Sequence, residues 1–239
     1  MTSIALATVL LTSSVPAQNK AGDVISTCMA RYHGEVYAAG DILLTAAVGN
    51  EKVQFKTTMQ FVRPNKIYIH QAVVGKNKSA LIVSDGTVLR YPNPKPQFAD
   101  RPVFEAVKQR DDKLLEVDDM YGVASQFLLD RSVPLEFVMN RTVDLELFSK
   151  LVTNLKYEGE AVLRGKDVDM VSGNLKSHPG GPIVGSFKMY VGKSGDMLRF
   201  ERVEMMQIEN RQIKAGYAWD VDVTVGKKEA VNDKLFRVR

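Results

Sequence analysis

The feature that most constrains the fold is an alternation of apolar and polar side chains with a period of two. It is clear along residues 53–63 and cleanest along residues 213–225. Successive side chains of a strand point to opposite faces, so this pattern predicts strands with one apolar and one polar face. Turn signals such as Gly49-Asn50 and Asp85-Gly86 separate neighbouring runs. We therefore expect an antiparallel sheet that is buried on one face.

Two segments have helical spacing instead. Residues 21–37 predict a helix capped by Gly22-Asp23, and residues 103–152 predict a helical insert after a stretch with four prolines. The insert carries one apolar stripe around Met120, a second that begins at Pro134, and a third at Leu147, Phe148 and Leu151.

The resulting order is one helix, about five strands, the helical insert and about five more strands. We predict an α+β fold: a single curved antiparallel sheet, an open or incomplete β-barrel of about 10–11 strands, with helices covering its concave face. A chain of 239 residues suits one such domain.

The charge of the chain argues against one class of partner. The net charge of +4 is only mildly basic, and Lys and Arg are spread along the sequence. A nucleic-acid partner is therefore not expected. With 45% hydrophobic and 25% charged residues, the composition is that of a globular protein.

The N-terminus predicts export. Residues 1–19 carry no charge, Ile4–Leu11 is apolar, and Val15-Pro16-Ala17 provides small residues before a cleavage point. We interpret residues 1–17 as a signal peptide and residues 18–239 as the exported, soluble domain, although the usual basic start is missing. The lone Cys28 is expected to be a small hydrophobic residue on the first helix.

Residue patterns for catalysis or metal binding are weak. The three histidines, His33, His70 and His178, are dispersed, and the pairs Asp167/Asp169 and Asp220/Asp222 fit the polar face of a sheet. Gly192-Lys193-Ser194 lacks the upstream glycine of a phosphate loop, since Phe187 stands there. We expect neither an enzyme nor a bound cofactor or metal.

One stretch, residues 60–94, carries a family resemblance. Its elements Arg63-Pro64-Asn65, Leu81–Gly86 and Tyr91-x-x-Pro94 resemble the LolA family of periplasmic carriers, which ferry lipoproteins towards the outer membrane. The resemblance implies a periplasmic, monomeric carrier. Its implied partners are an acylated lipoprotein or lipid, an inner-membrane release complex and an outer-membrane receptor.

An apolar inner surface is the candidate ligand site. Methionine is flexible and polarisable, so methionines suit a cavity for varied acyl chains. Strand parity also places Arg63 on this apolar face, and the resemblance implies that it holds a helical lid closed. The predicted cavity residues are Phe55, Met59, Phe61, Ile67, Ile69, Met120, Phe127, Leu128 and Met139.

A second hypothesis remains open. A sheet packed under helices needs apolar residues in any case, so the same pattern fits a non-catalytic regulatory, sensor or structural interaction domain with a filled core.

Overall fold

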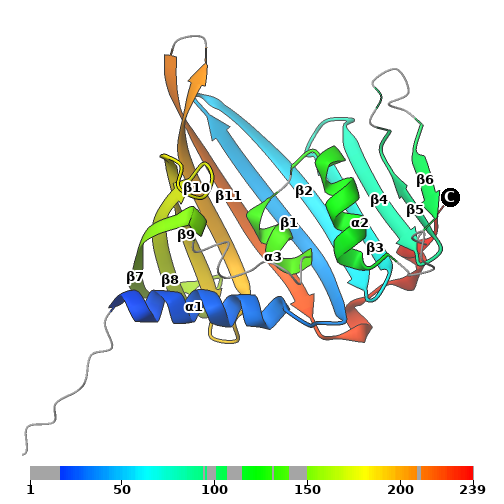
Figure 1. Cartoon of the computed structure of the whole chain (residues 1–239), viewed down its shortest axis with the longest axis horizontal. Coiled ribbons are helices and arrows are strands. Elements are labelled where there is room, and N and C mark those ends of the chain that lie inside the picture. The colour runs from blue at the N-terminus through cyan, green and yellow to red at the C-terminus, as the bar shows by residue number, and fades with distance from the viewer. Residues whose placement is uncertain are drawn as a thin grey trace, which may run out of the picture.

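The computed structural model describes residues 17–93, 95, 101–106, 115–130, 132–139, 150–208 and 211–238. Eleven strands form one antiparallel sheet in the order β6-β5-β4-β3-β2-β1-β11-β10-β9-β8-β7 (Figure 1). The strands are β1 (Tyr37–Val48), β2 (Glu51–Val62), β3 (Lys66–Val73), β4 (Ser79–Asp85), β5 (Val88–Tyr91), β6 (Val103–Ala106), β7 (Val152–Leu163), β8 (Lys166–Lys176), β9 (Ile183–Gly192), β10 (Met197–Ile208) and β11 (Arg211–Val225).

The first and last strands meet in the middle of the sheet. β1 pairs with β11 along eleven residues, with Ile42 opposite Val221. This pairing joins two runs of sequentially neighbouring strands, and the sheet stays open at its edge strands β6 and β7. The predicted single open antiparallel sheet is confirmed, with six strands before the helical insert and five after it.

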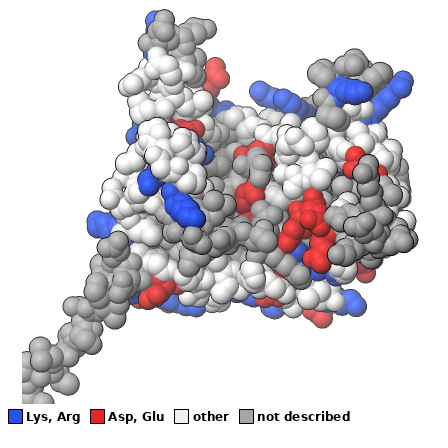
Figure 2. Space-filling view, in the orientation of Figure 1, with Lys and Arg blue, Asp and Glu red and all other residues white. Residues whose placement is uncertain are grey.

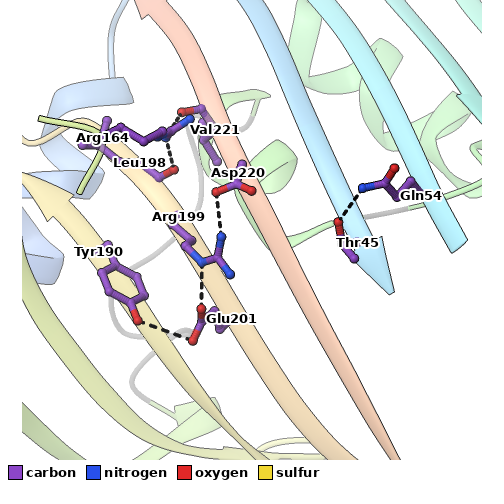
Figure 3. A network of polar contacts seen from close by, with 9 residues as sticks. All are labelled: Thr45, Gln54, Arg164, Tyr190, Leu198, Arg199, Glu201, Asp220 and Val221. Atoms are coloured by element: carbon purple, nitrogen blue, oxygen red, sulfur yellow. Dashed lines mark hydrogen bonds and ion pairs between the residues drawn. The ribbon is translucent and has the colours of Figure 1, made fainter. Parts of the chain in front are cut away.

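The period of two arises because the two faces of the sheet meet different surroundings. On β2, Met59 and Phe61 are buried on the inner face, whereas Lys56 points outwards and pairs with Asp41. Figure 3 shows the outer face of β9, β10 and β11, where Arg199 bridges Glu201 and Asp220. The carboxylates of Asp220 and of Asp169, which pairs with Lys193, therefore serve ion pairs between strands.

Arg164 provides hydrogen-bond donors where a register shift interrupts the ladder between β9 and β10. The register of β10 shifts between Met197 and Arg199, which interrupts its ladder with β9. Arg164 lies in the β7–β8 turn, and its Nη2 donates to the carbonyl oxygens of Leu198 (2.6 Å) and Val221 (2.9 Å) (Figure 3). Buried carbonyl groups need such donors, so the turn stabilises the neighbouring strands.

Three α-helices within the described ranges lie over the inner face of the sheet (Figure 1). They are α1 (Ala17–Tyr32), α2 (Val117–Ala124) and α3 (Val133–Met139), and the 3₁₀ turn η2 (Ser125–Phe127) follows α2. α1 buries Ala21, Ile25, Cys28 and Tyr32, which recur at helical spacing. Cys28 is fully buried, as expected of a small hydrophobic residue.

Two boundaries differ from the sequence prediction. The first helix spans residues 17–32, so Gly22-Asp23 lies inside it, and Gly34 turns the chain towards β1 with a φ of 82°. Residues 103–106 form an edge strand on β5 and not the start of a helix. A four-residue segment shows too little periodicity to identify, and pairing with β5 decides its conformation. The stripe at Leu147 and Phe148 and most of the predicted signal peptide lie outside the described residues.

The C-terminal segment covers part of the outer face, which the alternation does not reveal. Gln60 points outwards from β2, yet it is only 3% exposed. Its amide group exchanges two hydrogen bonds with the backbone of Asn232, at 2.7 and 3.0 Å. The 3₁₀ turns η3 (Lys228–Ala230) and η4 (Asp233–Phe236) lie in this segment, and Phe236 is buried.

The close approach of β1 and β11 gives a stability prediction. A Cβ atom at Gly40 would lie 2.1 Å from the backbone oxygen of Asp222, whereas a Cβ at Gly216 would meet nothing within 4 Å. We expect Gly40→Ala to lower the free energy of unfolding by about 1–3 kcal/mol. Gly216→Ala should be neutral or slightly stabilising, since it only restricts the unfolded chain. Urea unfolding of both variants checks this, and equal stability would contradict it.

Candidate functional site

The inner face of the sheet brings all nine predicted cavity residues into one hydrophobic cluster. Six are at most 1% exposed, and the other three are half-buried at its margin. The buried ones are Met59, Phe61, Ile67, Ile69, Met120 and Met139, and the half-buried ones are Phe55, Phe127 and Leu128. In this structure they pack as a filled interior. Phe127 also stacks on Tyr91 of β5, with 5.5 Å between ring centroids.

The helices over this cluster have a local reason to start where they do. Glu116 and Asp119 form a capping box at the start of α2. Acidic side chains are favoured at this end of a helix because the helix dipole is positive there. Figure 2 shows acidic side chains gathered where Figure 1 places α2. We call α2, η2 and α3 with their connections (residues 117–139) the lid.

Two of the three elements that carry the family resemblance, Arg63-Pro64-Asn65 and Leu81–Gly86, contact each other, and the first also contacts the lid. Asn65 donates to the carbonyl oxygen of Gly86 at 3.2 Å, and its own carbonyl oxygen accepts from the Ser84 hydroxyl at 3.0 Å. The Val117 N–H, the first of α2, donates to the carbonyl oxygen of Pro64 at 2.7 Å. The segment 63–65, which joins β2 to β3, therefore connects these strands to the start of the lid.

Arg63 lies at the centre of this connection. Its side chain is only 2% exposed, and its guanidinium group donates to three separate parts of the chain. Nη1 pairs with the Asp118 carboxylate at 2.5 Å, Nη2 donates to the Met139 carbonyl oxygen at 3.0 Å, and Nε donates to the Glu35 carbonyl oxygen at 3.0 Å. Arg63 thus joins α2, the end of α3 and the segment after α1 to the end of β2.

The contacts of the buried guanidinium group are strong, but they depend on its partners staying in place. Taking a charge out of water is costly unless it is paired and hydrogen-bonded. Here Asp118 neutralises the charge, and the Phe61 ring lies 4.8 Å from the guanidinium carbon. If the lid moved away, Arg63 would lose its carboxylate and one carbonyl partner together.

A second polar cluster, which the sequence analysis missed, holds the middle of the lid. Gln71 of β3 is fully buried, and its amide group exchanges hydrogen bonds with the backbone of Asp130 at 2.6 and 3.0 Å. Its nitrogen also donates to the Thr57 hydroxyl at 3.0 Å. The Asp130 carboxylate accepts from the indole Nε1 of Trp219 on β11 at 3.0 Å. This loop residue therefore bridges both halves of the sheet.

Burial changes the acid chemistry of Asp130. Its pKa is raised above the ordinary value of an aspartate, because removal from water disfavours the ionised form. The hydrogen bond from Trp219 acts in the opposite direction and offsets only part of this effect. The ionised carboxylate is therefore held at a cost in the closed structure.

Other kinds of site find no support among the described residues. No group of three or more His, Cys, Asp or Glu side chains there is placed to hold a metal ion. None of the helices in the described ranges is long and apolar enough to cross a membrane.

The comparisons with known proteins give structural neighbours only. The sequence matches no protein-family model, and it matches no curated protein. Similar solved structures include the lipoprotein LppX of Mycobacterium tuberculosis, with 10% identity, a TM-score of 0.44, and coverage of 84% of this chain and 93% of LppX. A Pseudomonas aeruginosa MucA/MucB complex matches at 10% identity and a TM-score of 0.44, with coverage of 90% of this chain and 60% of that one.

A third structure, from Vibrio parahaemolyticus, is provisionally described as an outer membrane lipoprotein-sorting protein domain. It is 8% identical, has a TM-score of 0.33, and the match covers 92% of this chain and all of that one. The description of this structure names lipoprotein sorting, the process served by the family that the sequence resembles. Because every one of these TM-scores is below 0.5, nothing that these proteins bind is carried over from the match.

The contacts of Arg63, which directly follows β2, predict that its substitution lowers stability far more than substitution of Lys56 on that strand. Arg63→Lys keeps the charge but cannot reach three partners at once, so we expect the free energy of unfolding to fall by about 2–4 kcal/mol. Lys56→Met breaks the Lys56–Asp41 pair, whose side chains are about half exposed, and should change it by less than ~1 kcal/mol. Similar losses in chemical unfolding would contradict the structural role of Arg63.

The raised pKa of Asp130 gives a pH prediction. A group whose folded pKa lies above its unfolded value supports the fold at low pH and loses that support as pH rises. Asp130→Asn keeps an oxygen acceptor for Trp219 and removes the charge. Relative to the wild type, the variant should therefore gain stability as the pH rises from about 4 to about 7.5. Unfolding free energies across this range test it, and a gap that narrows with pH would contradict it.

Proposed function

We propose that the protein is a non-catalytic periplasmic carrier that binds the acyl chains of lipoproteins or lipids. In this proposal the acyl chains enter the space between the sheet and the lid, and the carrier delivers its ligand towards the outer membrane. The structure would then be the closed, unloaded state, in which the lid fills the interior. The nine residues of the hydrophobic cluster would line the opened cavity, and Arg63 would hold the lid closed.

The observation that carries this proposal is a buried cation, Arg63, that joins α2, the end of α3 and the segment after α1 to the sheet. A permanent core is held well by apolar packing alone, and replacing a buried ion pair by apolar residues is often neutral or stabilising. A buried guanidinium group with lid partners instead suits a contact that must break and re-form. Both lid helices meet at Arg63, through Asp118 and Met139.

Magnitudes are consistent with reversible opening. Burial of an acyl chain of about 14 methylenes gains ~11 kcal/mol, at ~0.8 kcal/mol per methylene. The lid buries six Val, Leu, Phe and Met side chains, each at most 3% exposed, namely Val117, Met120, Leu135, Phe137, Val138 and Met139. Uncovering them costs roughly 9–18 kcal/mol at about 1.5–3 kcal/mol each. A loaded and a closed state of similar free energy would allow the ligand to be both taken up and handed on.

A second candidate is favoured by the packing itself. The inner-face residues Met59 and Phe61 of β2 and Ile67 and Ile69 of β3 are at most 1% exposed, as in a filled core. A regulatory, sensor or structural interaction domain of this fold would need no open cavity. The two candidates differ in whether an acylated molecule enters the interior.

Arg63→Leu tests the carrier proposal. The variant weakens the closed state by removing its polar contacts, so it should hold an acylated ligand roughly tenfold or more tightly than the wild type. We expect it to bind lipid but to release it poorly to acceptor vesicles. Native mass spectrometry with lipid extraction, on protein purified from the periplasm, measures the bound ligand. Transfer of a labelled lipoprotein measures its release.

Lys56→Met is the matched control, because it removes a cation from the outer face of the same strand. Normal transfer by Arg63→Leu would contradict the role of Arg63 in closure. A clean unliganded mass for wild type and variant, unchanged by added lipid, would instead favour the interaction domain with a filled core.

A further inference from the structure

The inner face carries polar groups where an acyl cavity alone would need none. Gln71, Thr57 and Trp219 lie on the same face as Met59 and Ile69, and all three are at most 4% exposed. Within the described residues, Asp130 of the lid provides the acceptors for those donors of Gln71 and Trp219 that point from the sheet towards the lid. When the lid leaves, these donors lose their acceptors inside an apolar surface, which is costly.

A cationic side chain, that of Arg202, lies near this cluster. Arg202 of β10 lies opposite Tyr217 of β11, next to the row in which Phe200 faces Trp219. Its guanidinium group pairs with Glu204, and its side chain is about one-third exposed. Its Nε is buried and has no hydrogen-bond partner among the described residues. One donor of this guanidinium group is thus left for an acceptor that the described residues do not supply.

The surroundings of these donors are aromatic. Tyr217 and Trp219 stack at 5.8 Å between ring centroids, and Phe200 lies 5.8 Å from Trp219. Burial and the nearby carboxylate of Glu204 raise the pKa of Tyr217, and Asp130 contributes in the same direction. The charge of Asp130 thus acts on Tyr217, which lies opposite Arg202 in the sheet.

We propose that Trp219, Gln71 and Arg202 form a head-group site that binds the anionic oxygens of an acylated ligand, and that Asp130 occupies part of this site when the lid is closed, with its carboxylate at Trp219 and its backbone carbonyl oxygen at Gln71. This inference rests on the proposed carrier function and narrows its ligand class. Arg202 and Glu204 neutralise each other, and Gln71 and Trp219 are neutral donors. The charge that leaves with Asp130 is thus replaced by the phosphate or carboxylate of the ligand, while its acyl chains take the space of the lid side chains.

The test compares three ligands with the same acyl chain: dioleoyl phosphatidic acid, dioleoylglycerol and oleate. Binding to the full chain is measured by native mass spectrometry over a range of lipid concentrations. We expect the wild type to prefer at least one anionic lipid over dioleoylglycerol by roughly tenfold or more, as hydrogen bonds to a charged group imply. Whether phosphatidic acid or oleate gains more distinguishes a phosphate from a carboxylate head group.

Trp219→Phe keeps the ring but removes the indole donor, so this preference should fall several-fold. Asp130→Asn removes the charge that competes with the anionic group of the ligand, so the variant should prefer anionic lipids more strongly than the wild type does. It tests the site independently if Trp219→Phe does not fold. Tyr190→Phe is the control, because it removes a hydroxyl group from the outer face, 3.5 Å from Glu201 (Figure 3).

Two outcomes overturn the inference in different ways. Equal binding of all three lipids, unaffected by Trp219→Phe and Asp130→Asn, would leave the carrier function standing and remove the head-group site. Failure of the wild type to bind any of the three would overturn the carrier function and the inference together.

Discussion

The rest of the structure depends on one constraint: an open sheet with one apolar face must have that face covered. The sheet ends at β6 and β7 and does not close on itself, so strands alone cannot bury the inner face. Helices supply the cover, and they are held by side-chain packing and a few polar contacts. Because the strand ladder does not include them, the lid is the layer that can move while the sheet keeps its hydrogen bonds.

The two polar clusters on the inner face respond differently to opening. At Arg63 the lid supplies the counter-charge, Asp118, so opening leaves a cation behind. At Trp219 the lid supplies the anion itself, Asp130, so opening removes a charge and leaves neutral donors. Loss of the counter-charge of Arg63 costs free energy in a low-dielectric interior, and so does loss of the acceptors of the Trp219 and Gln71 donors. Removal of the Asp130 charge itself relieves a cost of burial. An acylated molecule with an anionic head offsets the loss of these acceptors, whereas closure of the lid is what restores Arg63.

The sheet, its apolar face and the placement of Arg63 could be predicted because each follows from strand parity, a local property. The second polar cluster could not. Gln71 interrupts an alternating pattern without indicating a partner, and Asp130 lies in a connection with no periodicity. Their contacts join residues 59 and 89 positions apart, so only the folded sheet brings them together. The cover over Gln60 could not be predicted for the same reason, since its partner Asn232 is 172 positions away.

The spacing of the polar clusters constrains what fits between them. Thr57, opposite Gln71, and Arg63 lie on the same face of the β2 region, six residues apart, which is about 20 Å along an extended strand. Between them Met59 and Phe61, opposite Ile69 and Ile67, form an uninterrupted apolar stretch. On the other side of Thr57 and Gln71, Phe55 and Val73 continue the apolar face. In the carrier proposal the apolar part of a ligand lies on the stretch of Met59 and Phe61, which is the side of Thr57 and Gln71 that faces Arg63. A ligand oriented with its polar head at Trp219 would therefore direct its chains towards Arg63, where their entry displaces the lid helices that the guanidinium group holds.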